Sequence, residues 1–87
     1  MCRNIKRLHN VDPPAVDAEV RDAALQFVRK ISGTTRPSRA NAEAFERAVD
    51  EIASAAGRLL ATMVAGAPPA DREALAAKAR QRYQARA

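Results

Sequence analysis

Aromatic side chains are scarce in this 87-residue sequence, which contains two phenylalanines, one tyrosine and no tryptophan. Because the bases of single-stranded nucleic acids stack on aromatic rings, this shortage argues against a binding site built as a stacking platform. The sequence also has only one cysteine and one histidine, too few to supply the ligands of a zinc site. We therefore expect no metal and no cofactor.

The single cysteine bears on the compartment as well, because one thiol cannot form an internal disulfide. No stretch approaches the roughly 20 apolar residues of a membrane span, and the charged first residues lack the apolar run of a secretory signal. These absences predict a cytoplasmic protein. Phosphate-binding loops, Ser-His-Asp arrangements and paired catalytic carboxylates are not found either, so an enzyme is not the expected class.

The length of the chain allows a single domain, expected to span residues 1–87. Hydrophobic residues make up 47% of the sequence, but much of this fraction is alanine, which buries little area. A domain of this size buries only roughly 60–65% of the surface that its unfolded chain exposes. We therefore expect a thin core, which would gain from packing against a second chain.

The net charge of +5 is unevenly distributed along the sequence. Residues 1–11 contribute +3, 34–41 contribute +2 and 67–87 contribute +3, whereas 12–33 contribute −1 and 42–66 contribute −2. The basic character therefore lies in the two ends and in the loop between two expected helices, which are jointly acidic. Basic segments attract phosphate groups, so binding to nucleic acid without sequence specificity is one interpretation.

Apolar residues recur at spacings of three and four after Val16, as in an amphipathic helix. Asp12-Pro13-Pro14 precedes this pattern, and Gly33 is expected to end it in the left-handed conformation. The pattern predicts a helix over about 15–32. Its apolar stripe consists of Val20, Ala24, Phe27, Val28 and Ile31.

A second, cleaner stripe predicts a longer helix over about 39–65, capped by Ser38 or Asn41. This stripe consists of Phe45, Val49, Ile52, Ala56, Leu59, Leu60 and Met63. We expect the two helices to pack together, with Val20, Ala24, Phe27 and Ile31 against Phe45, Val49, Ile52 and Ala56. Truncation of either phenylalanine would then cost roughly 3–5 kcal/mol.

A third helix is expected over about 71–83, with a basic tail to residue 87 and a weak apolar edge of Leu75, Ala79 and Tyr83. The predicted fold class is therefore all-α: an antiparallel hairpin of two long amphipathic helices, with the N-terminal segment 1–11 and the short C-terminal helix packed on it. The second helix is longer than the first, so part of its stripe needs another cover. The N-terminal segment, the third helix and a second subunit are the candidates for Leu59, Leu60 and Met63.

Several blocks of the sequence occur together in one known group of proteins. They are the opening Met1-Cys2-Arg3-Asn4-Ile5-Lys6, then Pro13-Pro14, Val28–Gly33, Pro37-Ser38 and Ala44-Phe45. In these blocks and their order the chain resembles a family of short, uncharacterised bacterial proteins, over nearly its whole length. The family implies no established activity. Its members usually carry threonine where this chain has Val16, a departure that removes the side chain expected to form a capping box with Glu19.

Cys2 is the candidate for a chemical activity. If Met1 is removed, Cys2 carries a free α-amine beside its thiol, and neighbouring cations favour the thiolate. The residue could then act as a nucleophile with its own amine as base. The alternative is a small residue near a chain end without a chemical role. We interpret the one histidine, His9, as a surface or capping group, because His9 and Cys2 alone do not make a metal site.

The remaining candidates are cations that could contact phosphate groups: Arg3, Lys6, Arg7, Arg36, Arg39, Lys78, Arg80 and Arg82. The alternative is a solvated basic surface whose charges match the helix dipoles. Sequence-specific reading of DNA is not expected, because the first turns of the two long helices are acidic.

The leading interpretation is a non-enzymatic interaction module whose partner is another copy of the chain or another protein. Non-specific binding of nucleic acid and a thiol-dependent activity at Cys2 are the two alternatives.

Overall fold

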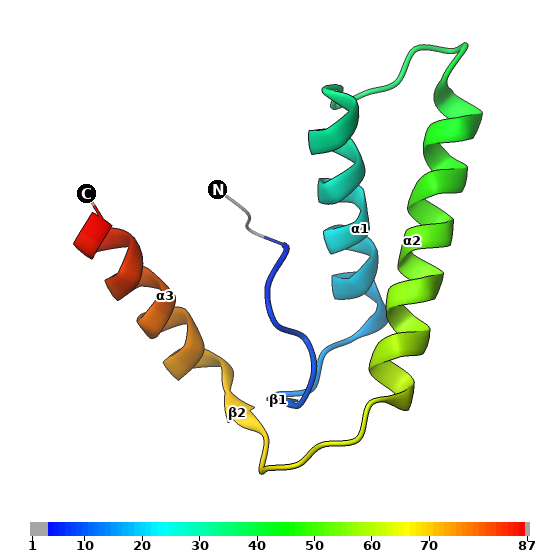
Figure 1. Cartoon of the computed structure of the whole chain (residues 1–87). Helices are drawn as coiled ribbons and strands as arrows, with labels where there is room; N and C mark the ends of the chain where they lie inside the picture. The colour runs from blue at the N-terminus through cyan, green and yellow to red at the C-terminus, as the bar shows by residue number, and fades with distance from the viewer. Residues whose placement is uncertain (1–3, 87) are drawn as a thin grey trace.

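A computed structural model describes residues 4–86, with side chains to residue 84. Two helices form an antiparallel hairpin. Two short strands lie side by side at the lower end of this hairpin in Figure 1, and a third helix extends from them. In chain order the elements are β1 (Val11–Asp12), α1 (Asp17–Ser32), α2 (Ala42–Thr62), β2 (Ala70–Asp71) and α3 (Arg72–Arg86). The fold is thus mainly helical, as expected, with a strand pair that the sequence did not predict.

The first helix begins two residues later than expected because Val16 occupies the N-cap position with extended backbone angles. The backbone N–H of Val16 donates to the Glu19 carboxylate over 3.0 Å, which is one half of a capping box. Valine has no side-chain oxygen, so the other half is missing. At the opposite end Gly33 has a φ of 71°, and its N–H donates to the carbonyl of Arg29. This left-handed residue ends the helix as predicted.

Replacing Val16 by threonine should stabilise the chain by about 1 kcal/mol, because the hydroxyl can accept a hydrogen bond from the Glu19 N–H. Val16 is 58% exposed, so little apolar burial is lost. For a domain of this size we expect the midpoint of thermal unfolding to rise by roughly 4–8 °C, measured by circular dichroism. Val16→Ala, which also lacks the oxygen, is the control and should give no such gain. A threonine variant that melts no higher than wild type would contradict this description of the helix start.

The second helix is shorter at both ends than the sequence suggested. Residues 38–41 form a turn in which the Asn41 N–H donates to the carbonyl of Ser38, so α2 begins only at Ala42. At its other end the Thr62 hydroxyl donates to the carbonyls of Arg58 and Leu59, and Met63 is already extended. Side-chain bonds of this kind satisfy the last carbonyls of a helix and allow the chain to leave it.

The core between α1 and α2 is small and consists of Ala24, Val28, Phe45 and Val49. Val20 is also buried, so the buried residues of α1 are Val20, Ala24 and Val28, four residues apart. Side chains at this spacing form a ridge that fits into the groove of a neighbouring helix. The prediction that Phe27 and Ile31 belong to this core was wrong. Phe27 is 44% and Ile31 67% exposed, because the buried ridge passes through Val28 instead.

The two strands pair in parallel and join the beginning of the chain to the segment before α3. Val11 is opposite Ala70 and Asp12 is opposite Asp71. Asn10 adds side-chain hydrogen bonds to the carbonyls of Ala67 and Pro68, at 2.9 and 3.3 Å. This short pairing fixes both segments at one end of the hairpin.

The third helix extends to Arg86 and is directed away from the hairpin rather than lying along it (Figure 1). Among the described residues the extensive helix packing is between α1 and α2, and α3 contacts β2. The expectation that this helix packs on the hairpin was therefore wrong. This helix offers little apolar area for such packing, because its only large apolar residues are Leu75 and Tyr83 and the others are alanines. Tyr83 is itself 61% exposed.

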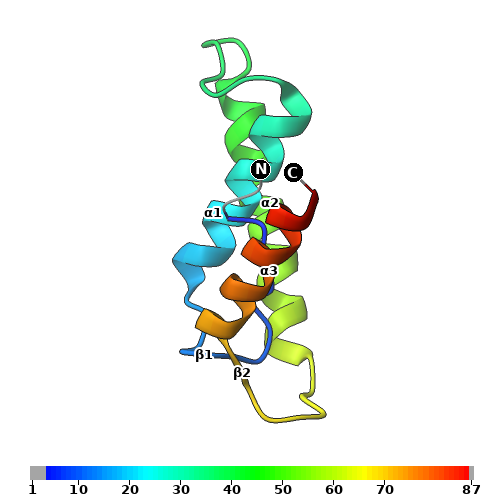
Figure 2. The same ribbon diagram turned by 90° about the vertical axis from the view of Figure 1, so that its left-hand side faces the viewer.

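The molecule is flat. Its Cα atoms extend over 45 × 37 × 15 Å, and in the view of Figure 2 the helices fall within one narrow band. In the two views together α1, α2 and α3 lie in one row across the molecule, so within residues 4–86 no other helix covers the broad faces of the α1–α2 pair (Figures 1 and 2).

Candidate functional site

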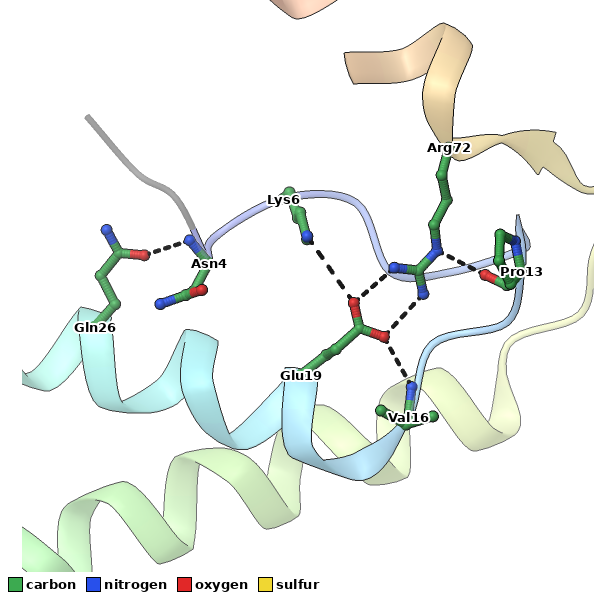
Figure 3. Close-up of polar contacts among 7 residues, drawn as sticks. All are labelled: Asn4, Lys6, Pro13, Val16, Glu19, Gln26 and Arg72. Carbon is green, nitrogen blue, oxygen red and sulfur yellow. Dashed lines mark hydrogen bonds and ion pairs between the residues drawn. The ribbon is translucent and has the colours of Figure 1, made fainter.

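Glu19 is the centre of the densest group of polar contacts, shown in Figure 3. Its carboxylate accepts two hydrogen bonds from the guanidinium of Arg72, Nη1 to Oε2 at 2.6 Å and Nη2 to Oε1 at 2.9 Å. Lys6 Nζ lies 3.9 Å from Oε2, and Arg72 Nε also donates to the carbonyl of Pro13 over 2.6 Å. We refer to Lys6, Glu19, Arg72 and the β1–β2 pair together as the clasp.

The contacts of the clasp keep both Glu19 and Arg72 charged at neutral pH. The bidentate hydrogen bonds from Arg72, with a further one from the backbone N–H of Val16, lower the pKa of Glu19 to about 2, although partial burial acts in the opposite direction. The same contact raises the pKa of Arg72. A carboxylate held in its ionised form with both oxygens engaged is a poor general base. The arrangement therefore anchors α3 and the N-terminal segment rather than providing acid–base chemistry.

The N-terminal segment runs over one side of α1. The backbone N–H of Asn4 donates to the side-chain amide of Gln26 over 2.7 Å (Figure 3). Arg7 bonds internally, with Nε donating to the carbonyl of His9 and Nη2 to that of Asn10. Two of the cations proposed as anion ligands, Lys6 and Arg7, are thus used to hold this segment in place.

Two open hollows flank the N-terminal segment. One, of about 450 Å³, is lined by His9, Asn10, Pro14, Leu60 and Pro69 among others. The second, of about 300 Å³, has mainly apolar walls, formed by Ile5, Leu8, Phe27, Ile52 and Leu59 among others. We refer to the second as the apolar hollow. It brings together Phe27 and Leu59, which lie outside the core and are 44% and 58% exposed.

The other candidate site residues are dispersed. Cys2 and Arg3 lie outside the described residues. Arg36 and Arg39 are in the loop between α1 and α2, at the end of the hairpin opposite the clasp, whereas Lys78, Arg80 and Arg82 belong to α3 (Figure 1). The structure therefore does not gather these cations into one surface, and the binding of nucleic acid stays a prediction.

Metal ligands do not cluster within residues 4–86, where no three histidine, cysteine, aspartate or glutamate side chains could jointly hold an ion. No helix of this part of the chain is long and apolar enough to cross a membrane.

The clasp itself was not predicted from the sequence. One signal was present, because Arg72 and Glu73 open a helix whose N-terminal dipole favours anions and disfavours a cation in the first turn. An arginine in that place indicates a carboxylate partner elsewhere. The sequence did not show that the partner is Glu19, 53 residues away.

The comparisons with known proteins agree with the sequence resemblance. A model of an uncharacterised conserved family, DUF2277, matches residues 1–78. No curated protein and no solved structure matches the chain. Since the match covers most of the sequence, from the opening residues through the clasp and into α3, the chain belongs to the uncharacterised conserved protein family DUF2277.

Proposed function

We propose that this protein is a non-enzymatic interaction module that works by self-association, two copies supplying each other with the layer that each lacks. The single observation that carries the proposal is the arrangement of the three helices in one row, which leaves the broad faces of the α1–α2 pair without a covering helix (Figures 1 and 2). Stable domains consist of two or more packed layers around a core, because a helix with one apolar face must bury it. A second copy placed on the apolar side of the hairpin would supply the missing layer.

The surface area supports this reading quantitatively. A compact monomer of this mass should expose about 5,000 Å², whereas the chain exposes 6916 Å². Its radius of gyration is 15.1 Å, against about 12 Å for a compact domain of this length. The excess of roughly 1,900 Å² per chain exceeds the about 800 Å² that each partner buries in an interface of standard size.

The exposed apolar side chains are numerous for so short a chain. Eight large ones are exposed within the described residues: Ile5, Val16, Phe27, Ile31, Leu59, Met63, Val64 and Tyr83. Three of them, Ile5, Phe27 and Leu59, line the apolar hollow, and apolar surface gathered in this way is typical of an interaction site.

Sedimentation equilibrium of the full chain should give the mass of a dimer at micromolar concentration. Leu59→Glu should shift the equilibrium toward monomer, because the change places a charge at an exposed position of the apolar hollow. Ser54→Glu, an exposed position on the same helix and outside the hollow, is the matched control and should leave the dimer intact. A wild-type chain that stays monomeric up to high concentration would contradict the proposal.

A further inference from the structure

We infer that α3 is an exchanged arm, so that the α3 helix of one copy lies on the apolar hollow of a second copy and the reverse contact completes a closed dimer. This inference rests on the self-association proposed above and names the surfaces that meet. Each copy offers one arm and one hollow, so a two-fold axis satisfies both at once and leaves no open end for further growth.

The arm needs a partner. A helix of 15 residues is marginal in water by itself, even with an alanine-rich sequence. Beyond its attachment at Arg72 and β2, α3 has no extensive packing against α1 or α2. Its apolar edge is nevertheless present, with Leu75, Ala79 and Tyr83 at spacings of four residues. Tyr83 is 61% exposed, which leaves most of a large ring in water.

While the clasp is closed, α3 cannot lie on the apolar hollow of the same chain. The start of α3 is fixed by the strand pair and by the three hydrogen bonds of the Arg72 guanidinium. In Figure 1 the N-terminal segment passes between α3 and α1, and in the view of Figure 2 α3 lies in front of this segment. Closing the arm onto its own hairpin would require the clasp to open, whereas contact with a second copy leaves the clasp intact.

Size and charge fit the exchange. The arm is about 22 Å long, close to the about 24 Å of α1, along which the hollow is formed. The walls of the hollow are mainly apolar, and its volume of about 300 Å³ can take in a large side chain such as that of Tyr83. Residues 67–87 carry +3, whereas residues 12–33 and 42–66 together carry −3, so the basic arm is attracted to the two helices of the mate. Among the described residues that line the hollow, the one charged residue is Lys6, whose ammonium lies 3.9 Å from the Glu19 carboxylate.

A cross-linking experiment distinguishes exchange from closure within one chain. The photoreactive residue p-benzoyl-phenylalanine replaces Tyr83, and this unlabelled protein is mixed with ¹⁵N-labelled protein of wild-type sequence. After irradiation, mass spectrometry should show links from position 83 of the light chain to heavy peptides that contain Phe27 or Leu59. Links confined to light–light pairs within a monomeric product would overturn the exchange.

Substitutions give a second, independent readout. Leu75→Glu should weaken dimerisation on the order of 100-fold, because it places a charge on the apolar edge of the arm, and Tyr83→Glu should act in the same direction. Gln81→Glu adds the same charge at an exposed position outside the Leu75–Ala79–Tyr83 edge and should change the dissociation constant less than about threefold. Circular dichroism of each variant and of wild type, at a concentration where both are monomeric, shows whether the substitution by itself changes the helical content.

The outcomes separate the two proposals. If wild type is dimeric but both edge variants dimerise as wild type does, or if the heavy links map outside the hollow, the exchange is wrong and self-association stands. If wild type is monomeric under all conditions, both proposals fall. An edge variant that dimerises poorly while its monomer has the same helical content as monomeric wild type supports the exchange.

Discussion

Replacement of Phe45 by alanine should remove a large share of the free energy of unfolding of this chain. Phe45 is 8% exposed and belongs to a core of four buried residues between α1 and α2. Truncating a buried phenylalanine costs roughly 3–5 kcal/mol, while a chain of this length has a total stability of about 4–13 kcal/mol. Urea unfolding followed by circular dichroism should therefore show a strongly lowered midpoint, or no native baseline.

Phe27→Ala is the matched control for this prediction, because it removes the same ring from the neighbouring helix. Phe27 is 44% exposed and lies outside the core, so we expect a loss of less than about 1 kcal/mol when the chain is monomeric. Equal destabilisation by the two variants would show that both rings are in the core, as the sequence alone suggested, and would contradict the packing described above.

Acidification should open the clasp within a defined range of pH. The folded chain holds the pKa of Glu19 at about 2, below its ordinary value of 4.5, because Arg72 and the Val16 N–H bind the ionised form. A lowered pKa in the folded state means that the contribution to stability is complete above about pH 4.5 and is lost as the pH falls toward 2. The protection of the amides of residues 70–84, measured as the exchange rate relative to that of an unstructured peptide at the same pH, should fall over this range, because α3 loses its anchor.

Glu19→Gln should show that loss of protection already at neutral pH, with little further loss on acidification down to about pH 2. Asp22→Asn is the matched control, since Asp22 is an exposed carboxylate of the same helix outside the clasp. The control should behave as wild type does. Exchange in α3 that is equally fast in wild type and Glu19→Gln at neutral pH would show that the ion pair does not hold this helix.

The two long helices were accessible from the sequence because their signals are local. The apolar stripe of residues 42–62 is regular over five turns, and Gly33 and the acidic first turns indicate where helices end and begin. The predicted stripe of α1 contained both Phe27 and Val28, but the contact with the second helix was assigned to Phe27. Val28 and Phe27 are adjacent, both are apolar, and only the approach of the partner helix decides which of them is buried.

The clasp could not be predicted because its parts are far apart in the sequence and individually weak. Strands of two residues show no alternation of apolar and polar positions. Arg72, Glu19 and Asn10 are common surface residue types, and nothing in a single sequence pairs them. The orientation of α3 follows from these contacts, so it was missed together with them.

The clasp also has a consequence for the order in which the chain is completed during synthesis. Asn10 bonds to Ala67, 57 residues later, and Arg72 bonds to Pro13, 59 residues earlier. At a translation rate of about 5–20 residues per second, Asn10 waits roughly 3–11 s for its partner to be made. The α1–α2 hairpin depends on nearer contacts and can fold within that time. Asn10 and Pro13 therefore reach their partners only after the hairpin has formed, and until they do, the apolar side of the new hairpin lacks part of the cover that residues 5–8 later provide.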